Sequence, residues 1–180
     1  MEFQRKNIRL PALRYAGQNW YFLTLVTEGR VQRFLNPGLV AETLELARDY
    51  ARMEGFAVWA YCFMPDHLHL MASGVTADAS LPRFLTRFKQ QTAYRFSRQN
   101  HQKLWQKKYH DHILRAGERW EPVACYIWMN PVRQGLCSRP EDWPASGSFD
   151  LDWRKLLSLG MEPWTPSWKA QHGGARSGAL

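Results

Sequence analysis

Two apolar stretches separated by a two-residue turn signal decide the fold: residues 56–64, FAVWAYCFM, and residues 67–73, HLHLMAS. Both are rich in aromatic and aliphatic residues, and Pro65-Asp66 stands between them, so they predict two antiparallel strands joined as a hairpin. Upstream, residues 20–27, WYFLTLVT, have a similar composition and predict a strand that comes earlier in the chain.

Helical patterns lie on either side of the hairpin. Apolar residues recur at helical spacing over residues 39–54, and Pro37-Gly38 before them indicates a turn. A second helix is predicted over residues 80–99, with Ser80 as its N-cap.

The last elements complete a known arrangement. Residues 105–114 predict a fourth strand, and residues 118–129 predict a short helix that stops before Pro131. The order is therefore β-α-β-β-α-β followed by an extra helix. This order predicts an α+β, ferredoxin-like fold, in which the helices cover one face of an antiparallel sheet.

Composition limits the class of protein. The chain has 180 residues, 45% of them hydrophobic and 22% charged, which is typical of one soluble domain and excludes wholesale disorder. The 24 Lys and Arg exceed the 16 Asp and Glu by eight, giving a net charge of +8. This balance, with 14% aromatic residues, favours a phosphate-rich partner.

The ends of the chain differ from its middle. Residues 1–145 are predicted to form the folded domain, with residues 1–18 as a basic arm, and residues 146–180 a Trp- and Pro-rich tail whose end, 171–180, is expected to be disordered. The three cysteines have no Cys-x-x-Cys spacing, and no apolar stretch is long enough for a signal or a membrane span. We therefore expect a protein of the reducing cytoplasm with no membrane partner.

His67 and His69 flank Leu68 on the third predicted strand. Side chains alternate along a strand, so both imidazoles share one face, with Cα atoms about 6.5–7 Å apart. Two imidazoles at this spacing can converge on one metal ion, whereas a pair of surface histidines is the simpler alternative. His110 and His112 repeat the spacing on the next predicted strand, so the pattern alone does not distinguish the pairs.

Tyr126 and Asn130 lie four residues apart on the last predicted helix and so share a face. A phenol and an amide oxygen there could serve as nucleophile and metal ligand. Packing of the tyrosine ring on the core, with Asn130 capping the helix before Pro131, would explain the same spacing.

Acidic residues are missing between Asp78 and Asp111. Positive charge there is interleaved with Phe84, Tyr94 and Trp105, which suits a nucleic-acid backbone with stackable bases; a solvated helix face is the alternative. The basic residues expected to bind DNA are Arg83, Arg87, Lys89, Arg95, Arg98, Lys103, Lys107 and Lys108, together with Arg5 and Arg9 of the arm.

Three segments in order carry a resemblance: YCFMPDHLHLMAS (61–73), LWQKKYHDHILR (104–115) and YIWMNPVRQGL (126–136). Together they resemble the REP-associated tyrosine transposases, which are bacterial relatives of single-tyrosine insertion-sequence transposases in the His-hydrophobic-His endonuclease superfamily. The resemblance runs from about residue 20 to residue 143. It implies a ferredoxin-like catalytic domain, a divalent metal ion, and cleavage of single-stranded DNA next to a hairpin.

The same resemblance implies roles for individual residues. His67 and His69 match the metal-binding pair, Tyr126 matches the nucleophile, and Asn130 matches a third metal ligand, a position where insertion-sequence relatives often carry Gln. Asp111, His112 and Arg115 match a further segment that is typical of this branch. The resemblance leaves two roles open for them, shaping the site or contacting DNA.

The implied chemistry needs a metal ion and a DNA partner. Imidazole ligands suit Mn²⁺ better than Mg²⁺, but Mg²⁺ is the abundant ion in cells, so either is expected. The expected partner is single-stranded DNA carrying a hairpin of a repetitive extragenic palindrome, at the bacterial nucleoid. The protein is expected to act as a monomer or a homodimer.

Two other functions fit parts of the pattern. Ferredoxin-like sheets also serve as non-catalytic nucleic-acid-binding modules. A metal-dependent nuclease that uses water instead of tyrosine is the second alternative, and Tyr126 would then be structural.

Overall fold

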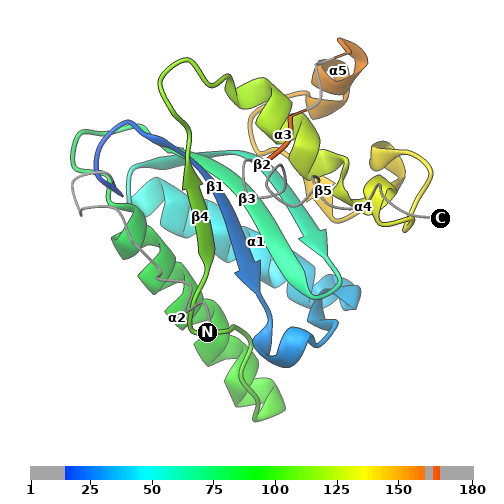
Figure 1. The fold of residues 1–180 in the computed structure, drawn as a ribbon. Helices are drawn as coiled ribbons and strands as arrows, with labels where there is room; N and C mark the ends of the chain where they lie inside the picture. Colours follow the sequence, from blue (N-terminus) through cyan, green and yellow to red (C-terminus); the bar gives the residue numbers. More distant parts are fainter. Residues whose placement is uncertain (1–14, 161–163, 167–180) are drawn as a thin grey trace, which may run out of the picture.

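The computed structural model describes residues 15–160 and 164–166. A five-stranded antiparallel sheet forms its centre, in the order β4-β1-β3-β2-β5 (Figure 1). The strands are β1 (Trp20–Val26), β2 (Phe56–Met64), β3 (His67–Gly74), β4 (His110–Ile113) and β5 (Ser146–Gly147). The β-α-β-β-α-β order and the α+β class are confirmed. The arm residues Arg5 and Arg9 and the end predicted to be disordered, 171–180, lie outside the described residues.

Helices cover both faces of the sheet. The α-helices are α1 (Pro37–Met53), α2 (Leu81–Asn100), α3 (Trp120–Trp128), α4 (Asn130–Arg133) and α5 (Trp153–Ser158). Short 3-10 turns occur at η2 (Glu28–Arg30), η3 (Arg33–Leu35) and η4 (Pro140–Asp142). None of the described helices combines the length and apolar character of a membrane span.

The alternation of side chains along the strands creates two cores. Leu23, Leu68 and Leu70 point to the face that α1 and α2 cover, where they pack with residues such as Phe84 of α2. Phe22 and Met71 point to the opposite face, where the core includes Ile127 and Trp128 of α3. The two helices of the ferredoxin-like unit therefore share one face, as predicted, and α3 lies on the other (Figure 1).

The predicted helix boundaries need small corrections. Pro37-Gly38 is not a turn but the first turn of α1, because the Asn36 side chain caps it by accepting the amides of Gly38 and Leu39. Ser80 stands at the N-cap of α2, but its side chain makes no capping hydrogen bond. The helix predicted over residues 118–129 begins at Trp120, and Glu118 before it binds other groups.

The prediction of one strand over residues 105–114 is wrong, because only the segment His110–Ile113 pairs as β4. Trp105 makes an isolated bridge with Thr27, and its buried indole donates to Thr92 of α2 at 2.8 Å. Lys89 donates to the main-chain carbonyls of Gln106 and Lys107 at 2.8 and 3.1 Å. Side chains of α2 thus fix the position of residues 105–107, which lead into β4.

The described segment 146–160 packs on this domain. β5 pairs with β2 as an additional edge strand, and the Trp128 indole donates to the carbonyl of Gly147 at 2.9 Å. Trp153 of α5 is buried against Trp128, with ring centroids 5.5 Å apart. These contacts enlarge the core on the α3 side of the sheet.

Candidate active site

The histidine pair sits at the start of β3, directly after the turn at Pro65-Asp66. The turn is anchored to β1, because Thr27 donates its amide and its hydroxyl to the Asp66 carbonyl at 3.0 and 2.9 Å. His67 and His69 share the α3 side of the sheet, as the strand period predicted. His69 is buried, with 8% of its surface exposed.

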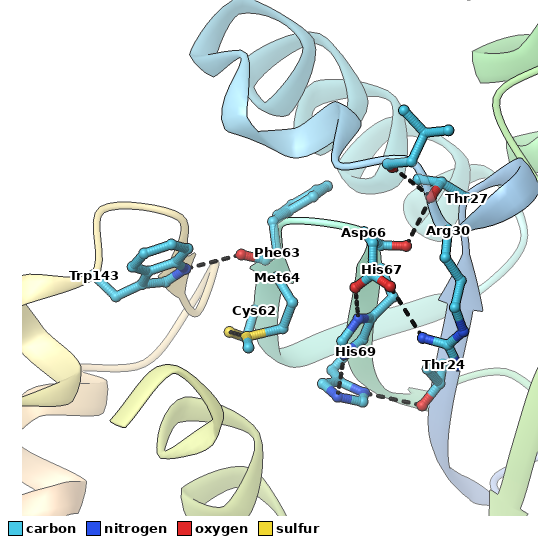
Figure 2. A network of polar contacts seen from close by, with 11 residues as sticks. Thr24, Thr27, Arg30, Cys62, Phe63, Met64, Asp66, His67, His69 and Trp143 are labelled. Atoms are coloured by element: carbon cyan, nitrogen blue, oxygen red, sulfur yellow. Dashed lines mark hydrogen bonds and ion pairs between the residues drawn. The ribbon is translucent and has the colours of Figure 1, made fainter. Parts of the chain in front are cut away.

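The two imidazoles converge through the same ring nitrogen. Nε2 of His67 lies 3.1 Å from Nε2 of His69. Their Nδ1 atoms point away from each other, to Asp66 Oδ1 at 2.5 Å and to Thr24 Oγ1 at 2.9 Å, respectively. Figure 2 shows this chain of contacts running from Arg30 through Asp66 and both histidines to Thr24.

This geometry fits a metal ion held between the rings. Two ligands at about 2.1 Å from one ion and at right angles to each other place their nitrogens about 3 Å apart. Metal-binding histidines also commonly direct the other ring nitrogen to a carboxylate or another outer partner, as His67 does toward Asp66. Among the described residues, no three His, Cys, Asp or Glu side chains form a metal-binding group.

The charge of Asp66 supports its role beside His67. Burial pushes the pKa of Asp66 upward, but the hydrogen bonds from His67 and Arg30 outweigh burial and keep that pKa below its usual value. Asp66 is therefore a carboxylate at neutral pH, and it can fix the orientation of the His67 ring.

Tyr126 lies on α3, above the same face of the sheet. Its ring packs perpendicular to Phe22, with centroids 6.0 Å apart, and Phe22 in turn stacks on His69 at 5.3 Å. A single aromatic residue of β1 thus bridges the predicted nucleophile and the histidine pair. The structure brings these three predicted site residues to one surface.

Asn130 is buried, with 6% exposed, and it is the first residue of α4, so the prediction that it lies on the same helix as Tyr126 is wrong; its side chain instead binds the end of α3. Its amide nitrogen donates to the carbonyls of Tyr126 and Ile127 at 3.1 and 3.2 Å. Pro131 has no N–H for the Ile127 carbonyl, so the Asn130 side chain supplies the missing donor. This leaves Oδ1 of Asn130 as the oxygen that could act as a ligand.

The β4 segment is split between the two faces. His112 lies opposite Phe22 on the site face, and its Nε2 contacts the Glu118 carboxylate at 3.1 Å. Asp111 lies opposite Leu23 and accepts a hydrogen bond from Tyr15 at 2.8 Å. Asp111 is therefore separated from the histidine pair by the sheet.

The Glu118 carboxylate accepts several hydrogen bonds beside the site. It accepts the Arg115 amide at 3.0 Å and the Trp164 indole at 2.9 Å, in addition to its contact with His112. Burial raises the pKa of Glu118, but these hydrogen bonds outweigh burial and lower it overall. Glu118 was not identified as a site residue from the sequence, where it stood only as the first residue of the helix predicted over residues 118–129, six residues after His112.

The predicted DNA-binding residues fall into two groups. Arg83 and Arg87 both bind Glu54, whose exposure is 2%, and Lys89 binds main-chain carbonyls, so these three hold the fold together. The other group has exposed side chains near or after the end of α2: Arg98, Lys103, Lys107 and Lys108. Among the described residues, none of these three lysines forms an ion pair. Arg95 is intermediate, since it contacts Glu42 at 3.4 Å.

The histidine pair of β3 and the tyrosine of α3 thus lie on one face of the sheet. The chain belongs to the IS200-like transposase family, whose profile matches residues 17–127. The predicted resemblance is confirmed by two relatives that carry the name REP-associated tyrosine transposase. The one from Haemophilus influenzae is 28% identical over 144 residues, covering 73% of this chain and 80% of the relative; the one from Escherichia coli is 23% identical over 149 residues, covering 76% and 85%.

A solved structure shares the fold. It is a REP-associated tyrosine transposase bound to a REP hairpin, with a TM-score of 0.62, 20% identity, and coverage of 92% of each chain. The ferredoxin-like prediction is thereby confirmed, and so is the prediction of a transposase.

Proposed function

We propose that this protein is a metal-dependent single-stranded DNA endonuclease and strand transferase that acts next to hairpins of repetitive extragenic palindromes. Tyr126 would carry the DNA as a covalent 5′-phosphotyrosine. The family, and the hairpin bound by the structural relative, support this substrate class. Such repeats are chromosomal, so the proposal places the protein at the nucleoid.

The observation that carries the proposal is the convergence of the His67 and His69 Nε2 atoms at 3.1 Å, on the face that Tyr126 covers. A binding module without chemistry has no need for two inward-facing imidazoles with their outer nitrogens fixed. The side-by-side placement of the pair and a tyrosine favours cleavage by that tyrosine.

The residues that would hold the metal ion are His67, His69 and Oδ1 of Asn130. A bound Mg²⁺ or Mn²⁺ would neutralise charge on a phosphate oxygen and so make the phosphorus a better electrophile. Asp66 and Thr24 keep the two imidazoles in place, which preserves the pair in the free protein.

Tyr126 would supply the nucleophilic oxygen. A bond forms between that oxygen and phosphorus, and the bond from phosphorus to the 3′ oxygen breaks. The phenol loses one proton and the departing 3′ oxygen gains one, so the step is balanced and leaves a free 3′-hydroxyl. The phosphodiester energy is retained in the link to Tyr126, which allows a second hydroxyl to rejoin the strand.

The DNA backbone would run along the edge of the sheet beside β4. Arg98, Lys103, Lys107 and Lys108 are exposed at or after the end of α2, on the approach to this strand. Binding that depends on such charges weakens steeply with salt, because phosphate neutralisation releases counterions. Arg83, Arg87 and Lys89 would contribute less to binding, since their charges already hold internal partners.

Tyr126→Phe tests the nucleophile. The variant keeps the ring and its contacts with Phe22, so we expect normal fold and hairpin binding but no covalent adduct and a cleavage rate lower by orders of magnitude. The measurement uses a labelled hairpin oligonucleotide with Mn²⁺ or Mg²⁺, resolved on a denaturing gel.

Tyr50→Phe, Tyr94→Phe and Tyr109→Phe are the matched controls, each removing one phenol elsewhere. An adduct in Tyr126→Phe would refute the assignment, and cleavage without an adduct in the wild type would support the water-using nuclease. Because Tyr126 contacts Phe22 of its own chain, we propose a complete site in one monomer. A mixture of the two inactive variants, Tyr126→Phe and His69→Ala, should then show no cleavage. Cleavage by the mixture would indicate a dimer in which each chain supplies its tyrosine to the other.

A further inference from the structure

Arg133 lies against the ring of Tyr126, although nothing in the sequence pattern singled it out. It is the last residue of α4, and its guanidinium carbon is 3.8 Å from the centre of the Tyr126 ring. Its Nη2 also donates to the Tyr126 carbonyl at 2.8 Å. One side chain therefore contacts both the ring and the backbone of the same residue.

The break between α3 and α4 makes this contact possible. In a continuous helix, residues seven apart are separated by a rise of about 10 Å. Here Met129 separates the two helices, and Pro131 supplies no main-chain donor to the turn before it. The Tyr126 carbonyl accepts from both Asn130 and Arg133, so the side chains after the break fasten the end of α3.

Two aromatic rings also contact the Tyr126 ring. Phe22 and Trp164 both pack perpendicular to it, with centroids 6.0 and 5.1 Å away. These contacts limit sideways movement of the ring, and Arg133 covers one of its flat faces. A planar cation over a phenol face is also electrostatically favourable.

We propose that Arg133 is a positioning residue, which orients Tyr126 for attack on the DNA phosphate. This inference rests on the proposed function, in which Tyr126 is the nucleophile. Attack requires the phenol oxygen to approach phosphorus along a narrow direction, and small misplacements of such a group are costly. Stacking and carbonyl binding together need the planar, forked guanidinium, which lysine lacks.

The test compares Arg133→Gln and Arg133→Lys with Arg154→Gln. Arg154 is a matched control, because its guanidinium carbon also lies against an aromatic ring, 4.9 Å from the centre of Trp153, and makes no contact with Tyr126 among the described residues. Under single turnover with saturating hairpin, we expect adduct formation to slow at least tenfold in Arg133→Gln and to recover only in part in Arg133→Lys. The hairpin Kd should stay within twofold of wild type, and Arg154→Gln should react normally.

A second measurement reports on Tyr126 without DNA. In protein labelled with ¹³C on tyrosine rings, the Tyr126 signal is identified by its loss in Tyr126→Phe. We expect this signal to shift in Arg133→Gln and to stay in place in Arg154→Gln. An unmoved Tyr126 signal, or a rate loss matched by an equal loss of hairpin affinity, would overturn the positioning role. If the wild type forms no adduct, the proposed function fails, and the ring spectrum still decides whether Arg133 holds Tyr126.

Discussion

The two His-x-His pairs have the same spacing and lie on the same face of one sheet, yet the structure gives them different roles. His67 and His69 stand on β3, an inner strand, and their Nε2 atoms meet at 3.1 Å. His110 and His112 stand on β4, an edge strand, where His110 is exposed and His112 contacts Glu118.

Position in the sheet explains the difference. β3 has a neighbour on each side, so Thr24 of β1 can fix one ring of its pair, and the hairpin turn supplies Asp66 for the other. Among the described strands β4 has only β1 as a neighbour, and the loop that follows β4 supplies Glu118 to a single ring. The same His-x-His spacing therefore gives two converging rings on β3, where each Nδ1 has a hydrogen-bond partner, and not on β4.

Replacing a histidine of the β3 pair should have the largest effect on cleavage. We expect His69→Ala or His67→Ala to lower the cleavage rate at least about 100-fold, since even loss of an outer partner of a metal ligand costs 10–100-fold. Hairpin affinity, measured by fluorescence anisotropy, should remain close to wild type because the basic surface is intact. Wild-type cleavage in either variant would show that this pair is no metal site.

His112→Ala should mainly affect stability. It removes a partly buried hydrogen bond to the Glu118 carboxylate, and a hydrogen bond to a charged group contributes about 1.5–3 kcal/mol to the free energy of unfolding. Urea denaturation should detect this loss, while cleavage by the folded protein should change less than tenfold. A cleavage defect as large as that of His69→Ala would mean that the histidine pair of β4 also takes part in cleavage.

Acid should weaken the contact between His112 and Glu118. The folded pKa of Glu118 lies below its unfolded value of about 4.3, so its carboxylate contributes stability above that pH, and the contribution is lost as pH falls through the folded pKa. The stability difference between wild type and Glu118→Gln should therefore shrink from pH 6 to pH 3. Glu45→Gln, at an exposed position on α1, is the control for the loss of one surface carboxylate.

His110→Ala should have the smallest effect. The side chain is exposed, and the usual change for such a surface substitution is within about 0.5 kcal/mol. Both urea denaturation and cleavage assays should match wild type. A tenfold loss of cleavage with normal stability would show that the edge strand delivers a group to the DNA.

Much of the site follows from local sequence rules. Strand alternation placed His67 and His69 on one face with Leu68 on the other, whereas helical spacing wrongly placed Tyr126 and Asn130 on one helix, because α3 ends at Trp128 and α4 begins at Asn130. These are relations between residues a few positions apart, which the period of a strand or helix determines. The same rules overextended β4 to residues 105–114, because a buried aromatic residue such as Trp105 marks a core contact as readily as a strand.

The sequence by itself determined the order of strands and helices and the two faces of β3. Only the tertiary structure decided that α3 covers the face bearing the histidine pair, that Arg83 and Arg87 bind the buried Glu54, and that Arg133 lies on the Tyr126 ring. Backbone periodicity sets which side chains share a face. Which partner meets that face depends on packing between segments far apart in the chain, and no local pattern encodes it.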